Sequence, residues 1–224
     1  MSVSIIIPTL NEASCLAETL AALREQQPRE VLVVDGGSQD ATGEIAGAAD
    51  LIFHSPPGRA RQMNLGAAHS TGDTLLFLHA DCQLETGALE AAENCLNSRN
   101  VVAGCFTMQV RASGLLYRWI DAWASARVRL TGMIYGDQGL FLSRQDFLQL
   151  GGFPELRFME DVYFSRMLRR QGRVVVAPKR IFVSPRRWQR TGLIRQTLRN
   201  WTLTGLAAGG VHPDRLARYY PATR

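Results

Sequence analysis

The stretch Thr74-Leu75-Leu76-Phe77-Leu78-His79-Ala80-Asp81-Cys82 decides the fold of this chain. It is a short apolar run that ends in a histidine and a carboxylate. Such a run is typical of a strand buried on both faces, as in a parallel sheet covered by helices. Ligands bind at the C-terminal edge of such sheets, so Asp81 is expected to face a cleft and hold a cation or polar ligand. The alternative is an aspartate that starts a turn or caps a helix near Thr86.

Strands and helices alternate four times in the first hundred residues. We expect strands at 4–7, 30–34, 51–54, 74–82 and 101–110, with the first strand stopped by Pro8 and Asn11 capping the first helix. This alternation predicts an α/β fold with a right-handed, mostly parallel central sheet flanked by helices. In the second half we expect a helix from Leu115 to Arg129, a helix ending near Gln171, and closing strands at 174–177 and 181–183. Trp119 and Trp123, one helical turn apart, are predicted to serve packing.

Composition and charge narrow the class of protein. The 224 residues suffice for one domain with its own core, and the four cysteines lack the paired spacing of zinc or redox sites. We therefore expect a reduced, cytoplasmic protein without a secretory signal or a membrane-spanning segment. Residues 179–224 carry ten basic and one acidic side chain, which predicts a localised anionic contact or a solvated basic tail.

Three clusters of polar residues are candidates for chemistry. The turn Asp35-Gly36-Gly37-Ser38 follows a buried strand, and its glycines allow close approach of a ligand. Arg59 and Arg61 lie at a helix N-terminus, where cations are unfavourable unless a phosphate or carboxylate is nearby. Glu160 and Asp161 also open a helix, where the dipole stabilises carboxylates. Capping alone is therefore an alternative for this last pair.

These pieces, in this order, resemble the family 2 glycosyltransferases of the A-type fold. The residues that carry the resemblance are Ile5 to Glu12, Val33 to Asp40, Asn64-Leu65-Gly66, Phe77 to Asp81, Gly151-Gly152-Phe153 and Glu160-Asp161. Each motif is weak alone, but six in the family's order are specific. The His-Ala-Asp and Gly-Asp-Gln-Gly versions look like the small bacterial subgroup labelled arsenosugar-biosynthesis-type, a label that specifies no activity.

The resemblance implies a Rossmann-related nucleotide-binding fold and a role for each matching residue. Asp161 is the expected general base, with Glu160 beside it as the other candidate. The expected donor-binding residues are Pro8, Thr9, Glu12, Asp35, Arg59, Arg61 and Asp81. Asp81 is also the implied ligand of a Mn²⁺ or Mg²⁺ ion that bridges the donor diphosphate. The expected acceptor-binding residues are Asp137, Gln138, Arg187 and Trp188.

The sequence departs from the family's pattern at two positions. Gly36 replaces an acid that in some members contacts uracil, so a UDP sugar is favoured over a GDP sugar by family frequency alone. His79 replaces the first acid of the Asp-x-Asp motif, which leaves one carboxylate for the metal. We therefore expect weak metal binding without the nucleotide.

The expected function is a metal-dependent, inverting glycosyltransferase that acts on a small or lipid-linked acceptor. A nucleotidyltransferase, or a non-catalytic protein that binds an anionic ligand through its basic C-terminus, is the alternative. We expect a catalytic domain at 1–185, with donor and acceptor halves at 1–110 and 111–185, and a basic amphipathic segment at 186–224. That segment predicts a peripheral contact with an anionic membrane rather than with nucleic acid.

Overall fold

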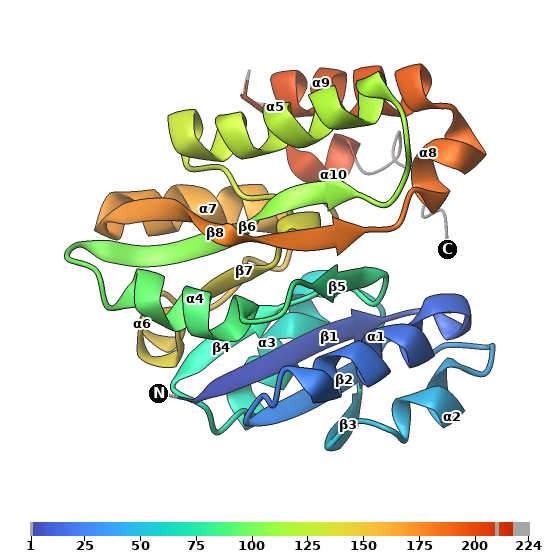
Figure 1. Cartoon of the computed structure of the whole chain (residues 1–224), viewed down its shortest axis with the longest axis vertical. Helices are drawn as coiled ribbons and strands as arrows, with labels where there is room; N and C mark the ends of the chain where they lie inside the picture. The colour runs from blue at the N-terminus through green and yellow to red at the C-terminus, as the bar shows by residue number, and fades with distance from the viewer. Residues whose placement is uncertain (1, 209–210, 217–224) are drawn as a thin grey trace.

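Eight strands form one mixed sheet in the computed structural model, which describes residues 2–208 and 211–216 (Figure 1). The strand order is β3-β2-β1-β4-β7-β6-β8-β5. The strands are β1 (Val3–Thr9), β2 (Glu30–Asp35), β3 (Leu51–His54), β4 (Thr74–Phe77), β5 (Cys82–Leu84), β6 (Val101–Val110), β7 (Leu140–Ser143) and β8 (Arg173–Val183). Strands β1 to β4 are mutually parallel, as predicted. Elsewhere in the sheet β7 is antiparallel to β4 and β6, β5 is antiparallel to β8, and β6 is parallel to β8.

Helices cover both faces of this sheet. They are α1 (Ala13–Glu25), α2 (Thr42–Ala46), α3 (Arg59–His69), α4 (Ala88–Leu96), α5 (Leu115–Thr131), α6 (Arg144–Gln149), α7 (Glu160–Gln171), α8 (Arg186–Thr191), α9 (Leu193–Ala208) and α10 (Pro213–Leu216), with a 3-10 turn η1 at Gly136–Gln138. None of the helices in the described part of the chain is both long and apolar enough to cross a membrane.

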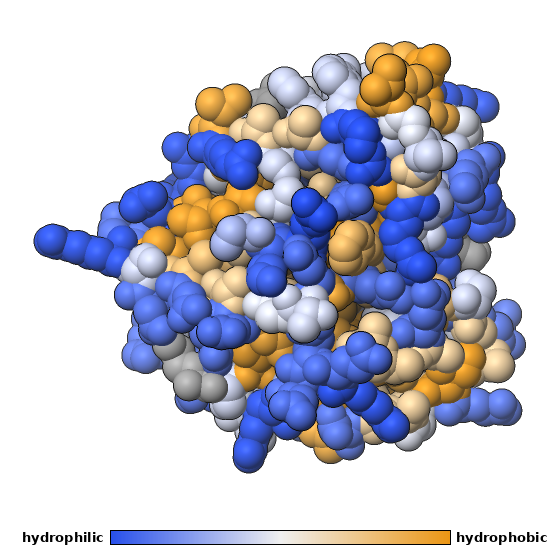
Figure 2. All heavy atoms as spheres, viewed as in Figure 1, coloured by the Kyte–Doolittle hydropathy of each residue, from blue (hydrophilic) through white to orange (hydrophobic). Residues whose placement is uncertain are grey.

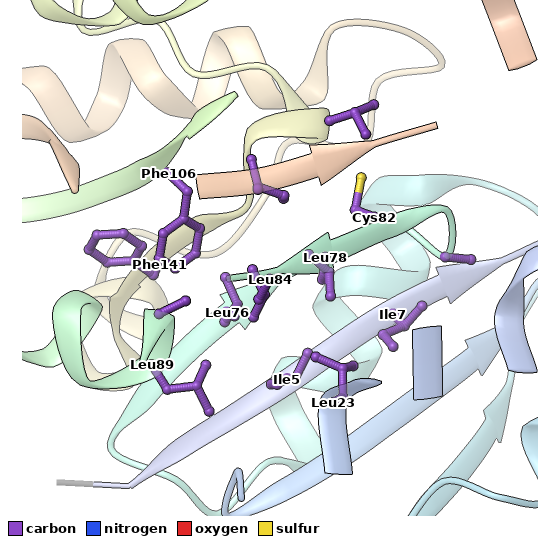
Figure 3. Close-up of a cluster of buried hydrophobic side chains, with 14 of the residues drawn as sticks. Ile5, Ile7, Leu23, Leu76, Leu78, Cys82, Leu84, Leu89, Phe106 and Phe141 are labelled. Carbon is purple, nitrogen blue, oxygen red and sulfur yellow. The ribbon is translucent and has the colours of Figure 1, made fainter. Parts of the chain in front are cut away.

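Two buried clusters, one on each face, hold the sheet and helices together. On the first face Ile5 and Ile7 of β1 share a cluster with Leu23 of α1, Leu89 of α4 and Phe106 of β6 (Figure 3). The second face packs α3 and α7 against β1, β4 and β7. A third, smaller cluster joins Leu203 and Ala207 of α9 to Met159 and Val162 at the start of α7. The C-terminal helix α9 is thereby fixed over the start of α7.

The apolar run that was expected to be one strand is divided in two. β4 ends at Phe77, where the Leu78 amide still donates to the Ile6 carbonyl at 3.0 Å. The chain then turns, because the Cys82 amide donates to the His79 carbonyl at 3.2 Å, and β5 begins at Cys82 against Val183 of β8. Asp81 therefore lies in a turn between two strands rather than at the end of one strand.

Three other local predictions are corrected. β1 runs through Pro8 to Thr9, which costs no sheet hydrogen bond on the β4 side because the β1–β4 pairing ends at Ile6. Asn11 does not cap α1; it has a φ of 53°, and its side chain accepts a hydrogen bond from the Gln39 amide instead. The two predicted closing strands are one strand, β8, with a register shift at Ala177/Arg180.

Candidate active site

The parallel register of β1 and β2 places Thr9 directly beside Asp35 at the C-terminal edge of the sheet. Thr9 Oγ1 donates to Asp35 Oδ1 at 3.2 Å, and the amides of Gly37 and Ser38 donate to Oδ2 at 3.1 and 2.9 Å. Burial alone would raise the pKa of Asp35, but these hydrogen bonds and that of the Ser38 hydroxyl outweigh it and hold the pKa below its usual value. Asp35 is therefore an anion that orders the turn after β2.

Gln62 of α3 explains why a glycine fits at position 36. Its buried Nε2 donates to the carbonyls of Thr9 and Val34 at 2.7 and 2.8 Å. A Cβ added at Gly36 would lie 3.1 Å from that nitrogen and 3.3 Å from the Thr9 carbonyl. An acidic side chain at position 36 would therefore displace the Gln62 amide.

Arg186, at the start of α8, links the two carboxylates expected on the donor side. Its Nε lies 3.0 Å from Asp81 Oδ2, and its Nη2 pairs with Glu12 Oε2. Both acids are nearly buried, and Asp81 lines a pocket of about 330 Å³ together with Cys15, Gln83 and Arg186. The guanidinium supplies the positive charge that these two acids need within the protein.

Asp161 lies in a second pocket, of about 80 Å³, under α9. Charged side chains from three distant segments, Arg59, Asp137 and Arg187, line it with Asp161 and His79. The Gly136 amide donates to Asp161 Oδ2 at 2.6 Å, and the Val162 amide donates to Oδ1 at 2.7 Å. The carboxylate is held rigidly at the first turn of α7 by these bonds.

The pKa of Asp161 is raised to about 7, first by burial and then by the charge of the neighbouring Glu160. The helix dipole alone predicts a lowered pKa, so this part of the sequence-based prediction is wrong. Glu160 does not line this Asp161 pocket, and its Oε1 lies 3.8 Å from Arg59 Nη1, which compensates its charge. A carboxylate with a pKa near neutrality is suited to accept a proton.

Asp137 of η1 has an oxygen without a hydrogen-bond partner. Its Oδ1 is buried and unpaired among the described residues. Burial raises its pKa, Arg127 and Arg187 oppose that rise, and the charge of Asp81 adds to it. Asp137 is thus close enough to Asp81 for the charge of Asp81 to act on it, and its unpaired oxygen lies in a residue that lines the Asp161 pocket.

Three predicted site residues are placed differently from the expectation. Gln138 is fully buried, and its Oε1 accepts from Arg127 and from the Tyr135 amide, so its side chain faces the protein interior and its acceptor role stays a prediction. Trp188 is 7% exposed and packs at right angles to Tyr117, so most of its ring belongs to the core. Arg61 pairs with Glu155 at 2.9 Å, and both of these side chains are more than half exposed.

The donor set for a divalent cation is sparse. Within residues 2–208 and 211–216, no three His, Cys, Asp or Glu side chains form a cluster that could hold a metal. Asp81 and the unpaired oxygen of Asp137 are ligands of the hard type that Mg²⁺ and Mn²⁺ prefer. A cation held by either carboxylate would take its remaining ligands from a diphosphate and water, and weak binding of the metal without the nucleotide stays a prediction.

Several residues of the site were not predicted from the sequence. Arg186 stands beside two other candidates in the run Arg186-Arg187-Trp188, and no local signal distinguishes it from Arg187. Tyr135 and Asn200 line the Asp161 pocket from opposite ends of the chain's second half. Only the fold brings them together, so a pattern in the sequence could not reveal them.

Comparison with known proteins establishes the family. The model of Glycosyl transferase family 2 matches residues 4–153, two thirds of the chain, and the protein belongs to this family. The arsenosugar-biosynthesis-type subgroup stays a prediction.

Curated relatives match over shorter stretches. Glycosyltransferase AglE of Haloferax volcanii is 39% identical over 111 residues, which are 44% of this chain and 36% of the relative. The 4,4'-diaponeurosporenoate glycosyltransferase of Staphylococcus haemolyticus is 35% identical over 101 residues, 40% of this chain and 27% of the relative. The aligned stretches thus span about a third of the length of these relatives.

Solved structures share the fold. The mannosyltransferase PcManGT of Pyrobaculum calidifontis, in complex with GDP-Man and Mn²⁺, has a TM-score of 0.65 and 24% identity, covering 81% of this chain and 56% of the other. S. aureus TarS 1–349 in complex with UDP-GlcNAc has a TM-score of 0.66 and 20% identity, covering 82% and 58%. Both neighbours support the predicted A-type glycosyltransferase fold.

Proposed function

We propose that this protein is a metal-dependent, inverting glycosyltransferase that moves a sugar from a nucleoside-diphosphate donor to an acceptor hydroxyl. The observation that carries the proposal is Asp161, a partly buried carboxylate with a pKa raised to about 7 in a pocket lined by Arg59, Asp137 and Arg187. Family membership and structural neighbours in complex with GDP-Man or UDP-GlcNAc support a sugar nucleotide as donor. A UDP sugar is our first expectation and a GDP sugar the second.

In this mechanism Asp161 accepts the proton of the acceptor hydroxyl as its oxygen forms a bond to the anomeric carbon. The bond from that carbon to the diphosphate breaks on the opposite side, which inverts the configuration. The Gly136 and Val162 amides donate to the two carboxylate oxygens and so fix the orientation of the carboxylate in the pocket. A divalent cation at Asp81 would neutralise the charge that develops on the departing diphosphate.

The test separates donor binding from chemistry. We would titrate UDP and GDP into the wild type, Asp81→Asn and Asp161→Asn by calorimetry, with and without Mn²⁺. We expect Mn²⁺ to strengthen nucleotide binding to the wild type and to Asp161→Asn, but not to Asp81→Asn. The Asp161 variant is the matched control because it removes one carboxylate from the other pocket. Mn²⁺-dependent binding that survives in Asp81→Asn would contradict the metal assignment.

A further inference from the structure

An exposed apolar face covers the end of the molecule formed by α5 and α9. Nine of the twelve large hydrophobic side chains that are exposed in the described residues lie on these two helices. On α5 they are Leu115, Leu116, Trp119, Trp123 and Leu130, and on α9 they are Ile194, Leu198, Trp201 and Leu206. The helices lie side by side in Figure 1, and Figure 2 shows hydrophobic side chains at the same upper edge. We call these nine residues the α5–α9 face.

Three tryptophans at the centre of this face pack mainly on one another. Trp119 and Trp123 are stacked with ring centroids 6.1 Å apart, and Trp201 of α9 lies 5.4 and 5.9 Å from them. Their side chains nonetheless stay 51, 46 and 41% exposed. The packing predicted for Trp119 and Trp123 is therefore incomplete. A contiguous patch of this kind on a folded protein marks an interaction surface.

The charged residues around the face indicate which kind of partner it fits. Helices α5, α8 and α9 contain eight arginines and one acid, and that acid, Asp121, is buried and paired with Arg118 at 2.9 Å. Arg129, Arg190 and Arg195 are exposed on these helices. Apolar and indole side chains beside arginines suit a bilayer with anionic head groups. A second copy of the chain is disfavoured, because two such faces would bring their arginines together.

A groove between α5 and α9 lies next to the proposed catalytic pocket. Trp119, Trp123 and Trp201 line this groove. Tyr135, Asp137 and Asn200 line both the groove and the pocket of Asp161. The groove thus shares one wall with the pocket of the proposed base.

We propose that the α5–α9 face docks on an anionic lipid bilayer and that the groove admits the head group of a lipid-borne acceptor to Asp161. The docking is inferred from the α5–α9 face alone. The role of the groove, in contrast, depends on the proposed glycosyl transfer. The docking surface differs from the segment expected from the sequence: α5 contributes half of it, and Arg186 is engaged with Glu12 and Asp81 instead.

Vesicle co-sedimentation of the full chain, without donor or acceptor, tests the docking. We expect binding to vesicles of phosphatidylcholine with phosphatidylglycerol, weaker binding to phosphatidylcholine alone, and loss at high salt. The double variant Trp119→Ala/Trp201→Ala and the double variant Arg190→Glu/Arg195→Glu should each weaken binding by about tenfold or more. Leu148→Ala and Arg99→Glu, exposed residues on other elements, are the matched controls and should bind like the wild type.

Two results would overturn the docking. One is a wild type that does not distinguish the two lipid mixtures; the other is a dimer in sedimentation velocity that the tryptophan variant dissociates. The role of the groove is tested separately, through the ratio of turnover with bilayer-bound to soluble acceptor alcohols. We expect Asn200→Leu to lower this ratio. An unchanged ratio would refute the role of the groove in admitting the head group, but not the docking. A wild type that binds vesicles but transfers no sugar would refute the proposed function alone.

Discussion

Asp161 combines ionisation near neutral pH with burial, and the two together decide how the proposed reaction should respond to pH. A general base acts only when it is deprotonated, and the pKa of Asp161 is raised to about 7 by burial and by Glu160. Turnover should therefore rise with pH through about 7 and level off above it. The same carboxylate in water would already be fully ionised at pH 5.

Substitution of Asp161 tests that role directly. Asp161→Asn should lower kcat by roughly 10²- to 10⁴-fold and abolish the rise with pH, with the affinity for the donor unchanged. Initial rates of donor consumption across pH 5 to 9 would measure both effects. Glu160→Gln, the neighbouring carboxylate paired with Arg59, is the control and should lose less. A variant that loses donor affinity in step with kcat would assign Asp161 to binding instead.

At the scale of elements, the short helix α8 sends three consecutive side chains to three places. Arg186 reaches Glu12 and Asp81, Arg187 lines the Asp161 pocket, and Trp188 enters the core. The helix thus links Glu12 and Asp81 to the pocket of Asp161. Its anchoring depends on Arg186, because removal of one partner leaves buried charges uncompensated.

Replacement of Arg186 should therefore destabilise the fold. We expect Arg186→Met to lower the free energy of unfolding by about 1–3 kcal/mol, less than for a fully buried pair, because the Arg186 side chain is 35% exposed. Mn²⁺ should restore more stability to this variant than it adds to the wild type, since Asp81 is then free to bind a cation. Urea denaturation with and without Mn²⁺ measures both. The control is Arg190→Met on the same helix; equal stability of the two variants would contradict the anchoring role.

Most helices and strands, but not all of them, could be predicted from the sequence. Short apolar runs and glycine-rich turns located most strands and helices, because burial on both faces and local backbone freedom leave a direct pattern. The break after Phe77 left no such pattern. The run from Leu78 to Cys82 stays apolar enough for a strand, and the turn closed by the Cys82 amide on the His79 carbonyl is what divides it. Similarly, Asp35 and Asp161 were predicted from their motifs, whereas the pairing of Arg186 depends on tertiary contacts.

At the scale of the whole molecule, the C-terminal helices complete the site. Leu203 and Ala207 of α9 cover Met159 and Val162 beside Asp161, and the Tyr135 hydroxyl lies 2.9 Å from Thr204 Oγ1. The predicted division into 1–185 and 186–224 stays a prediction, and these contacts describe two parts that pack closely. This cover adds to the burial of the Asp161 carboxylate, which together with the charge of Glu160 raises its pKa.

The raised pKa of Asp161 lowers the stability of the folded chain, and the size of this loss depends on pH. The pKa of Asp161 is about 7 in the folded chain and near 3.8 in the unfolded chain, so the folded state binds the proton more tightly. Its contribution to stability is full below about pH 4 and is lost as pH rises to about 7.

The side chain of Asp161→Asn cannot ionise, so this variant should not lose stability as the pH rises to 7. We expect the free energy of unfolding of the variant, relative to the wild type, to increase from pH 4 to pH 7 and then to stay constant. The amide loses one acceptor for the Gly136 or Val162 N–H, but that loss does not vary with pH, so the slope isolates the titration of Asp161. Urea denaturation of both proteins at each pH measures it, with Asp146→Asn on α6 as a control that removes an acid outside the site. A difference that is flat between pH 4 and 7 would mean that α9 does not shield Asp161 from water in solution.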